Sequence, residues 1–306
     1  MRTPGFFALA LGVLSACGDG QTGAGTGRVQ IFVVPEDSIP EGLTPGTGEE
    51  NVVDGWRVEY SKFLVAIGGF RAGQSAHPAA ALSAPRVWIV DLLRVPSAGL
   101  VLADLEAEAG RWDRFGFDLP NATPAAERAE GTAEADHERM VQGGLSLYVA
   151  GTLTRPDGQS CLPTRPADCK PAPRITFAWG LRVGTSFDDC APAAGDAGFA
   201  VPPHGAVQVK PTLHGDHWFF SNITQGAEIT RRRAQWIANA DLDRDGETTL
   251  AELRMTRAAD LFSAEDYNLS GALFPIFTAE DYLEAQARSL GDYQGDGECP
   301  TRRLLP

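Results

Sequence analysis

The chain has 306 residues, with 26 Lys and Arg against 40 Asp and Glu, and its formal net charge is −14. Hydrophobic residues make up 43 % of it, which is enough for a sizeable buried core. An acidic balance of this size argues against nucleic acid and anionic lipid as partners, because both would repel it. We therefore expect a globular body with an acidic surface that suits divalent cations.

The N-terminus has the composition of an export signal. Arg2 supplies a positive start, and the apolar run from residue 6 to residue 16 is shorter than the roughly 20 residues a spanning helix needs. The run ends in Leu-Ser-Ala followed by Cys17, which resembles a bacterial lipobox, where the cysteine thiol takes the lipid. We predict a lipoprotein signal peptide over residues 1–16 and a lipidated Cys17. Ordinary secretion with a chance cysteine is the alternative.

The next residues predict how the body is held. Residues 17–27 are rich in glycine and indicate a flexible tether. Gly18 follows the cysteine, where lipoproteins retained at the inner membrane carry Asp, so the resemblance implies the outer membrane. We expect a soluble body in the cell envelope, on the periplasmic face or at the surface. The lipid on Cys17 would be the only part of the protein that attaches it to the membrane.

Four further cysteines predict two disulfides. An even number of cysteines in an oxidising compartment favours pairing, and the absence of Cys-x-x-Cys makes a cysteine metal site the weaker alternative. Four cysteines allow three pairings. We favour Cys161–Cys169, which closes a short Pro-rich loop, and Cys190–Cys299, which ties the C-terminal tail to the body.

The region 28–224 is predicted to be an antiparallel β-sandwich. It contains short runs of β-branched and aromatic residues bounded by Gly, Pro, Asn or Asp, without regular helices between them. The predicted strands are Arg28–Val34, Val58–Ile67, Val87–Leu93, Asp113–Leu119, Leu145–Leu153, Ile175–Val183 and Ala206–Leu213. The Ala- and Glu-rich stretch 121–142 is predicted to be an exposed, partly helical insertion, and residues 155–174 a hairpin connection.

The pattern becomes helical in residues 225–306. Apolar positions at helical spacing predict helices over Ala227–Ala240 and Thr249–Ala259. Thr278 with Asp281 three residues later matches a capping box at the start of a third helix. The fold expected for the whole chain is therefore mostly β, an antiparallel sandwich followed by a C-terminal helical EF-hand segment.

The stretch from residue 241 to residue 252 matches an EF-hand calcium loop. Such a loop takes oxygen ligands from positions 1, 3, 5, 7, 9 and 12 and turns sharply at a glycine in position 6, here Gly246. The predicted calcium ligands are Asp241, Asp243, Asp245, the backbone of Glu247, Thr249 and bidentate Glu252. The alternative is an acidic turn without an ion, which would leave three aspartates repelling one another.

Two features favour a structural ion over a sensor. Position 8 is Thr248, where an aliphatic residue usually pairs with a second loop. The stretches beginning at Asp266 and Asp292 start like such a loop, but the first has Phe277 at position 12 and the second has no exit helix. We expect a single site of modest affinity, with a dissociation constant on the order of 10⁻⁴ to 10⁻³ M as in extracellular modules.

Three of the five histidines lie close together in the sequence, at His204, His214 and His217. Gly215 permits a turn that could bring His214 and His217 together, with Asp216 as a further ligand or as an orienting group. Imidazole pairs suit copper or zinc. The alternative is a structural turn whose histidines make hydrogen bonds near the junction of sandwich and helices.

Two family resemblances accompany these motifs. The order Trp56–Phe70, Val87–Asp91, Arg111–Leu119 and Phe177–Gly180 resembles the methanobactin-cassette partner family of periplasmic copper-binding proteins. That resemblance implies a β-rich fold and copper bound through histidines, sometimes with an oxidised tryptophan, and here through His214 and His217 beside Trp218. The His-Gly-Asp-His turn followed by a calcium loop resembles uncharacterised myxobacterial-type lipoproteins, which implies no activity.

Enzyme motifs are absent from the sequence. There is no Gly-x-Ser-x-Gly and no P-loop, and His137-Glu138 lacks the second zinc-binding histidine because position 141 is Val. Our first hypothesis is a calcium-binding, lipid-anchored protein without catalysis, and the second is a copper-handling protein. A carboxylate-dependent hydrolase is the third, since such catalysis leaves little trace in sequence.

Overall fold

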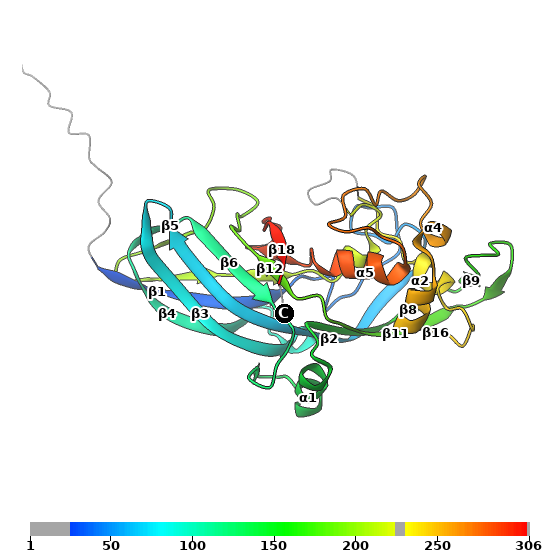
Figure 1. Ribbon diagram of the computed structural model, residues 1–306, viewed down its shortest axis with the longest axis horizontal. Coiled ribbons are helices and arrows are strands. Elements are labelled where there is room, and N and C mark those ends of the chain that lie inside the picture. Colours follow the sequence, from blue (N-terminus) through cyan, green and yellow to red (C-terminus); the bar gives the residue numbers. More distant parts are fainter. Residues whose placement is uncertain (1–24, 224–229, 305–306) are drawn as a thin grey trace, which may run out of the picture.

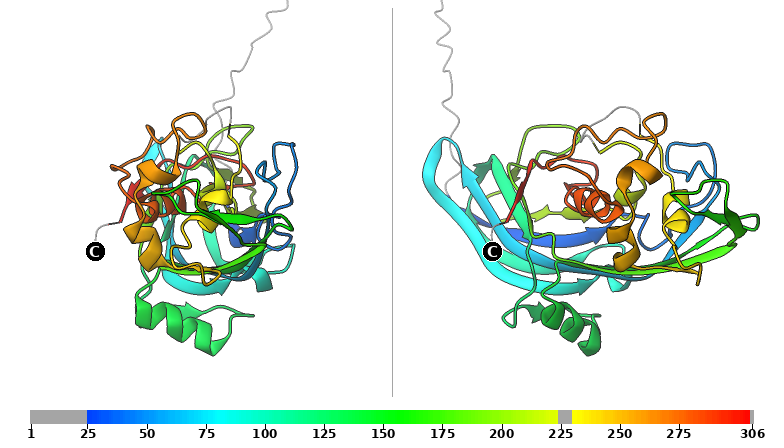
Figure 2. Two further views of the ribbon diagram at one scale, coloured as in Figure 1. Left: turned by 90° about the vertical axis from the view of Figure 1, so that its right-hand side faces the viewer. Right: turned by 45° about the vertical axis from the view of Figure 1, so that its right-hand side comes forward.

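The computed structural model describes residues 25–223 and 230–304, and in this part of the chain the fold is mostly β. Two curled sheets form a trough (Figures 1 and 2). The C-terminal helices lie over the concave side of the trough, and α1 (Glu134–Gly143) lies beneath the convex side. This arrangement agrees with the predicted β-rich body.

The larger sheet has nine strands in the described residues, in the order β16-β11-β8-β2-β6-β12-β18, with β3 beside β2 and β7 beside β3. Its strands are β2 (Arg57–Gln74), β3 (His77–Asp91), β6 (Arg114–Leu119), β7 (Glu127–Arg128), β8 (Leu147–Thr154), β11 (Arg174–Leu181), β12 (Thr185–Phe187), β16 (Glu247–Thr248) and β18 (Thr301–Arg303). Its central pairs are antiparallel, but β11–β16 and β3–β7 are parallel.

The smaller sheet has five strands in the described residues, in the order β14-β1-β15-β17 with β4 beside β1. Its strands are β1 (Thr26–Pro35), β4 (Leu100–Glu108), β14 (Ala206–Val209), β15 (Pro211–Leu213) and β17 (Gly291–Tyr293). Two short ribbons are separate: β5 (Gly110–Trp112) pairs with β13 (Phe199–Val201), and β9 (Gln159–Cys161) with β10 (Cys169–Pro171). Each of the seven predicted strands overlaps an observed one.

Alternation explains why these segments become strands. Every second residue of β8 is buried, including Leu147, Val149 and Leu153, and β11 alternates in the same way. Most buried apolar residues of both sheets join those of the C-terminal helices in one core, whereas Leu64, Ala66 and Ile89 of the larger sheet pack with Met140 of α1 in a second cluster. Trp179 of β11 stacks on Trp236 at a ring distance of 6.1 Å, so the edge of the larger sheet and the C-terminal segment share packing.

The predicted helical C-terminal segment is not confirmed as such. Its helices are short, namely α2 (Gln235–Asn239), α3 (Leu250–Met255), α4 (Ala258–Leu261) and α5 (Ala279–Ala287), and it also supplies β16, β17 and β18 to the sheets. Of the helix expected over Ala227–Ala240, residues 227–229 lie outside the described residues, and in the rest the helix begins only at Gln235, because Arg232 forms β-bridges to Val52 and Phe220. The capping box of Thr278 and Asp281 is present at the start of α5.

Both predicted disulfides are present. Cys161–Cys169 joins the β9–β10 hairpin, and Cys190–Cys299 ties the tail to the body. Residues 1–24 lie outside the described residues, and with them the predicted signal peptide, Cys17 and most of the tether. In the described ranges we find no helix whose length and apolar character would let it cross a membrane.

Candidate metal centres

The turn of the predicted calcium loop has the backbone that its sequence requires. Gly246, at position 6, has φ +88°, a conformation that glycine adopts without strain. Thr249 caps α3, and its hydroxyl accepts from the backbone N–H of Glu252 in a capping box. The loop thus runs from the end of α2 into α3, as the motif predicts.

Three carboxylates meet inside this loop. Oxygen atoms of Asp241, Asp243 and Glu252 all lie within 4.8 Å of one another. Asp241 is 1 % exposed, and its Oδ1 has no hydrogen-bond partner, whereas Oδ2 accepts from the N–H of Gly246 at 3.1 Å. Burial is the main cause that raises the pKa of Asp241, and the charge of Glu252 adds to it. An uncompensated buried oxygen beside two carboxylates is an environment that a cation would relieve.

The predicted ligands also accept hydrogen bonds from other residues of the loop. Asp245 Oδ1 accepts from the N–H of Glu247 at 2.8 Å, and Asp243 Oδ1 accepts from the N–H of Asp245 at 3.2 Å. Glu252 Oε1 accepts from the N–H of Leu242, and its Oε2 accepts from Thr249. The structure therefore gathers three of the six predicted residues, and the other three hold the turn around them.

The loop pairs with the larger sheet where an EF-hand would pair with a second loop. Glu247 and Thr248 form β16, which runs parallel to β11 opposite Thr176 and Phe177. Trp179 Nε1 donates to the carbonyl of Thr248 at 2.8 Å, and the Thr248 hydroxyl donates to the carbonyl of Ile237 at 2.8 Å. Thr248 is fully buried, so the unusual residue at position 8 has a physical role in joining loop, sheet and α2.

The second centre is built on the His-Gly-Asp-His turn that follows β15. A Cβ on Gly215 would lie 2.8 Å from Ile39 Cγ1, so only glycine lets the turn approach that side chain. Ser38 Oγ accepts from the N–H of Gly215 at 2.9 Å, and the hydroxyl of Tyr60 donates to its carbonyl. The turn is therefore fixed against residues near the start of the chain.

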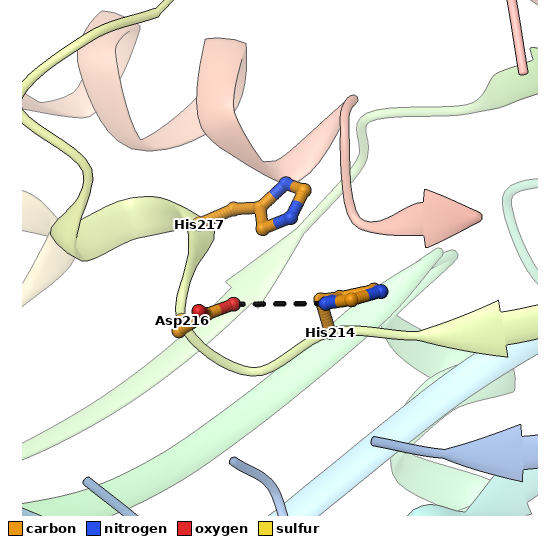
Figure 3. Close-up of side chains that lie close together, drawn as sticks. All are labelled: His214, Asp216 and His217. Carbon is orange, nitrogen blue, oxygen red and sulfur yellow. Dashed lines mark ion pairs between the residues drawn. The ribbon is translucent and has the colours of Figure 1, made fainter. Parts of the chain in front are cut away.

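The turn brings three potential metal ligands together. One ligand atom from each of His214, Asp216 and His217 lies within 4.8 Å of the others, and all three residues are buried (Figure 3). Nδ1 of His214 lies 3.9 Å from Oδ1 of Asp216, which has no hydrogen-bond partner. The prediction that Gly215 would allow His214 and His217 to converge agrees with this geometry.

Charged residues from distant segments complete this environment. Arg232 Nε donates to Asp216 Oδ2 at 2.7 Å. Nε2 of His214 lies 3.1 Å from Oδ2 of Asp292, although without the alignment of a hydrogen bond. Burial lowers the pKa of His214, but the contact with Asp292 and the charge of Asp216 outweigh it and raise this pKa to about 9.

His217 is oriented by Ser289, in the turn that follows α5, and stays neutral. Its Nδ1 lies 2.9 Å from Oγ of Ser289, and its ring packs against Phe220. Burial, followed by the positive charges of His214 and Arg232, holds its pKa well below the usual value. These residues line a cavity of about 280 Å³, and a neutral imidazole anchored through one nitrogen is the form that binds a transition metal.

His204 is not part of this centre, contrary to expectation. It lies in the exposed turn between β13 and β14 with φ +58°, and its N–H donates to the carbonyl of Thr26. Closeness in sequence misled the prediction, because β14 and β15 separate His204 from the turn. Arg232 and Ser289 were missed because neither lies within a recognisable motif, and Asp292 was considered only as the start of an incomplete calcium loop.

The two donor sets fit different ions. The calcium loop offers oxygen atoms alone, as calcium prefers, and the turn offers two imidazoles and a carboxylate, as zinc or copper prefers. Compared with known proteins, the chain matches no family model, no curated protein and no solved structure. These two sites are therefore the features of the molecule that point to a function.

Proposed function

We propose that this protein is a calcium-binding, lipid-anchored protein of the cell envelope, with one structural site in the loop Asp241–Glu252 and no catalysis by that site. The observation that carries the proposal is the buried Asp241 Oδ1, which has no partner and lies in a group with Asp243 and Glu252. A bound calcium would neutralise these carboxylates. Asp245, Glu247 and Thr249 would complete the oxygen shell.

The position of the loop supports a structural role. The loop is attached to β11 through β16, and its preceding helix contributes Trp236 to the core. An ion here would hold the C-terminal segment against the edge of the sheet. Because no second loop is needed for that, the site would stabilise the fold instead of switching it.

Thermal melts and calorimetric titrations with calcium test this proposal. In calcium at about a hundred times the dissociation constant, the free energy of unfolding should rise by about 2.7 kcal/mol relative to chelator. Glu252→Gln should lose this increase because it removes a charged ligand, whereas Glu265→Gln, on an exposed turn, should keep it. A wild-type melting temperature indifferent to calcium would contradict the proposal.

The anchoring part of the proposal is tested separately. It rests on the Leu-Ser-Ala-Cys sequence ending at Cys17. Mass spectrometry of the protein made with its full N-terminus should find acyl chains on Cys17, and Cys17→Ser should move the protein from the membrane fraction to the soluble one. An unmodified Cys17 in the native host would refute the anchor but leave the calcium site unaffected.

A second candidate function is copper or zinc binding at the turn His214–His217. It is supported by the buried, unpartnered Asp216 Oδ1 facing the two imidazoles, and by the contact that orients His217 from Ser289. His214, Asp216 and His217 would hold the metal, and Asp292 would orient His214 from behind. A bound metal ion would compensate the charge of the buried Asp216 carboxylate.

Elemental analysis after equilibration with zinc or copper and desalting tests the second candidate. One equivalent of metal should remain on the wild type, and His217→Ala should lose it, whereas His77→Ala, at an exposed histidine, should not. Hydrolysis by paired carboxylates stays the third hypothesis. Two carboxylates lie close to His214, those of Asp216 and Asp292. Asp216 already contacts Arg232, and Asp292 already contacts His214, which favours metal binding over acid–base catalysis.

A further inference from the structure

The two disulfides differ in how far solvent reaches them. Cys190 and Cys299 are each 0 % exposed, so a reductant in solution does not reach their bond while the protein is folded. Cys161 and Cys169 are partly exposed, and their bond joins the β9–β10 hairpin at one end of the molecule (Figure 1). Because thiol–disulfide exchange needs access to a sulfur atom, a dithiol should reduce the hairpin bond selectively.

The hairpin directly contacts the predicted calcium loop. Arg244, at position 4 of the loop, donates from Nη2 to the backbone carbonyl of Asp168 at 2.6 Å, and the same Nη2 lies 2.9 Å from Asp168 Oδ1. The hydrogen bond from Arg244 is the main cause that holds the pKa of Asp168 below its usual value. Asp168 immediately precedes Cys169, so this contact lies one residue from the disulfide.

A second contact joins the hairpin to the helix that precedes the loop. The N–H of Cys161 donates to Oδ1 of Asn239 at 3.0 Å, and Nε2 of Gln235 donates to the carbonyl of Gln159 at 2.7 Å. Gln235 and Asn239 lie one turn apart on α2, and Nε2 of Gln235 also donates to Oδ1 of Asn239 at 2.9 Å. The hairpin therefore holds both α2 and the fourth residue of the loop.

Arg244 also connects the hairpin to a predicted calcium ligand. Its φ of +64° is uncommon for a residue other than glycine and persists only where the surroundings support it. Burial raises the pKa of Asp241, and the backbone N–H groups of Gly246 and Arg244 oppose this effect, so Arg244 acts on the carboxylate directly. A guanidinium released from Asp168 would also leave an unpaired positive charge within the loop, which opposes the binding of a cation.

We propose that the Cys161–Cys169 disulfide sets the calcium affinity of the loop, so that the site responds to the thiol redox state around it. The proposal rests on the calcium site proposed above. A dithiol would attack one sulfur, form a mixed disulfide and leave as a cyclic disulfide, so that two electrons and two protons end on Cys161 and Cys169. The opened hairpin would release Arg244 and Asn239, and reoxidation would restore both contacts.

Calorimetric titration with calcium, before and after reduction by dithiothreitol of the folded protein, tests the proposal. Alkylation and mass spectrometry of a sample show that Cys161 and Cys169 are reduced and that Cys190–Cys299 is intact. The calcium dissociation constant should rise roughly fivefold, at the lower end of typical coupling between sites. Binding should not be abolished, because the gathered carboxylates belong to the loop itself.

The outcomes separate this proposal from the calcium site itself. Unchanged calcium affinity in protein reduced at the hairpin would overturn the redox control and leave the calcium site standing. A hairpin bond that resists the dithiol would do the same. Calcium binding in neither form would overturn both proposals.

A variant of Arg244 tests the route of the coupling. Arg244→Gln removes the guanidinium that reaches Asp168, so the affinities of its oxidised and reduced forms should differ less than about twofold. Arg257→Gln is the matched control, because Arg257 is 73 % exposed and pairs with Asp260 outside the loop, and it should keep the full response. A full response in folded Arg244→Gln protein would overturn the proposed route.

Thermodynamic linkage supplies an independent measurement. If reduction weakens calcium binding, calcium must disfavour reduction by the same factor. Protein equilibrated with a fixed ratio of dithiol to cyclic disulfide should therefore hold a roughly fivefold lower ratio of reduced to oxidised hairpin in saturating calcium than in chelator. Cys161→Ser with Cys169→Ser, if melts show that it folds, should bind calcium as weakly as the reduced wild type. Equal ratios in calcium and in chelator would contradict the proposal.

Discussion

The two candidate metal centres differ in which parts of the chain supply their residues. The calcium loop takes its three gathered carboxylates from twelve consecutive residues, whereas the histidine centre combines a turn with Arg232, Ser289 and Asp292 from other segments. A local site needs only its own turn, so its geometry should survive damage elsewhere. A site assembled from distant segments depends on whatever holds these segments together, and the two centres should therefore respond differently to the same perturbation.

The largest difference should follow removal of the disulfide Cys190–Cys299. This bond spans 109 residues and holds the tail that carries Asp292, so Cys190→Ser with Cys299→Ser should cost about 5 kcal/mol of unfolding free energy. Cys161–Cys169 spans 8 residues, and its removal should cost about 2.5 kcal/mol. Urea unfolding measures both.

Metal retention in the same proteins sharpens the comparison. The folded fraction without Cys190–Cys299 should still bind calcium but should lose zinc or copper, because Asp292 no longer supports His214. Equal loss of both metals would mean that the calcium loop is not the local unit described above.

The next largest effect concerns pH in metal-free protein. The folded pKa of His214, about 9, lies above the usual histidine pKa of about 6.5, so the folded state binds this proton more tightly than the unfolded chain does. The resulting stabilisation is complete below pH 6.5 and is lost as the pH rises through 9, by at most about 3 kcal/mol. Chemical unfolding at a series of pH values should show this slope, and His214→Gln should remove it.

The calcium loop provides the contrast in that experiment. Its predicted ligands are carboxylates and contain no histidine, so the stabilisation that calcium adds should stay constant over the same pH window. A replacement at the exposed His77 should leave the slope unchanged. A flat profile in the wild type would show that Asp292 and Asp216 do not hold a proton on His214.

These contrasts also explain what could be predicted from sequence. The strands around Leu147–Thr154 and the loop from Asp241 were found because alternation and ligand spacing are local properties. Asp292 was considered only as the start of a stretch that resembles a calcium loop but lacks an exit helix, and no local pattern linked it to the histidines. Its carboxylate contacts His214 instead, because β17 pairs with β15 and the tail is folded back. The parallel pairing of β16 with β11 could not be predicted either, because it joins segments far apart in the sequence and has no local sequence pattern.

A smaller effect should come from the attachment of the calcium loop to the sheet. Trp179→Phe removes the hydrogen bond to the carbonyl of Thr248 and should cost about 2 kcal/mol, while weakening calcium binding several-fold. Trp112→Phe is the matched control, because Trp112 Nε1 donates to the carbonyl of Glu108 far from the loop. It should lose similar stability with unchanged calcium affinity in calorimetry. Equal calcium affinity in both variants would show that the sheet edge does not replace a partner loop.

The smallest expected effect comes from replacing one glycine with a left-handed backbone in each region. Gly246, in the calcium loop, has φ +88°, and Gly295, in the turn after β17, has φ +96°, with no backbone or side-chain atom closer than 3.8 Å to an added Cβ at either position. Alanine at each position should therefore cost only the strain of a left-handed conformation, about 1 kcal/mol. Melts should show this loss in both variants, but only Gly246→Ala should reduce calcium affinity. If Gly295→Ala reduced it equally, the loop would depend on the distant turn, and the distinction between a local and an assembled site would fail.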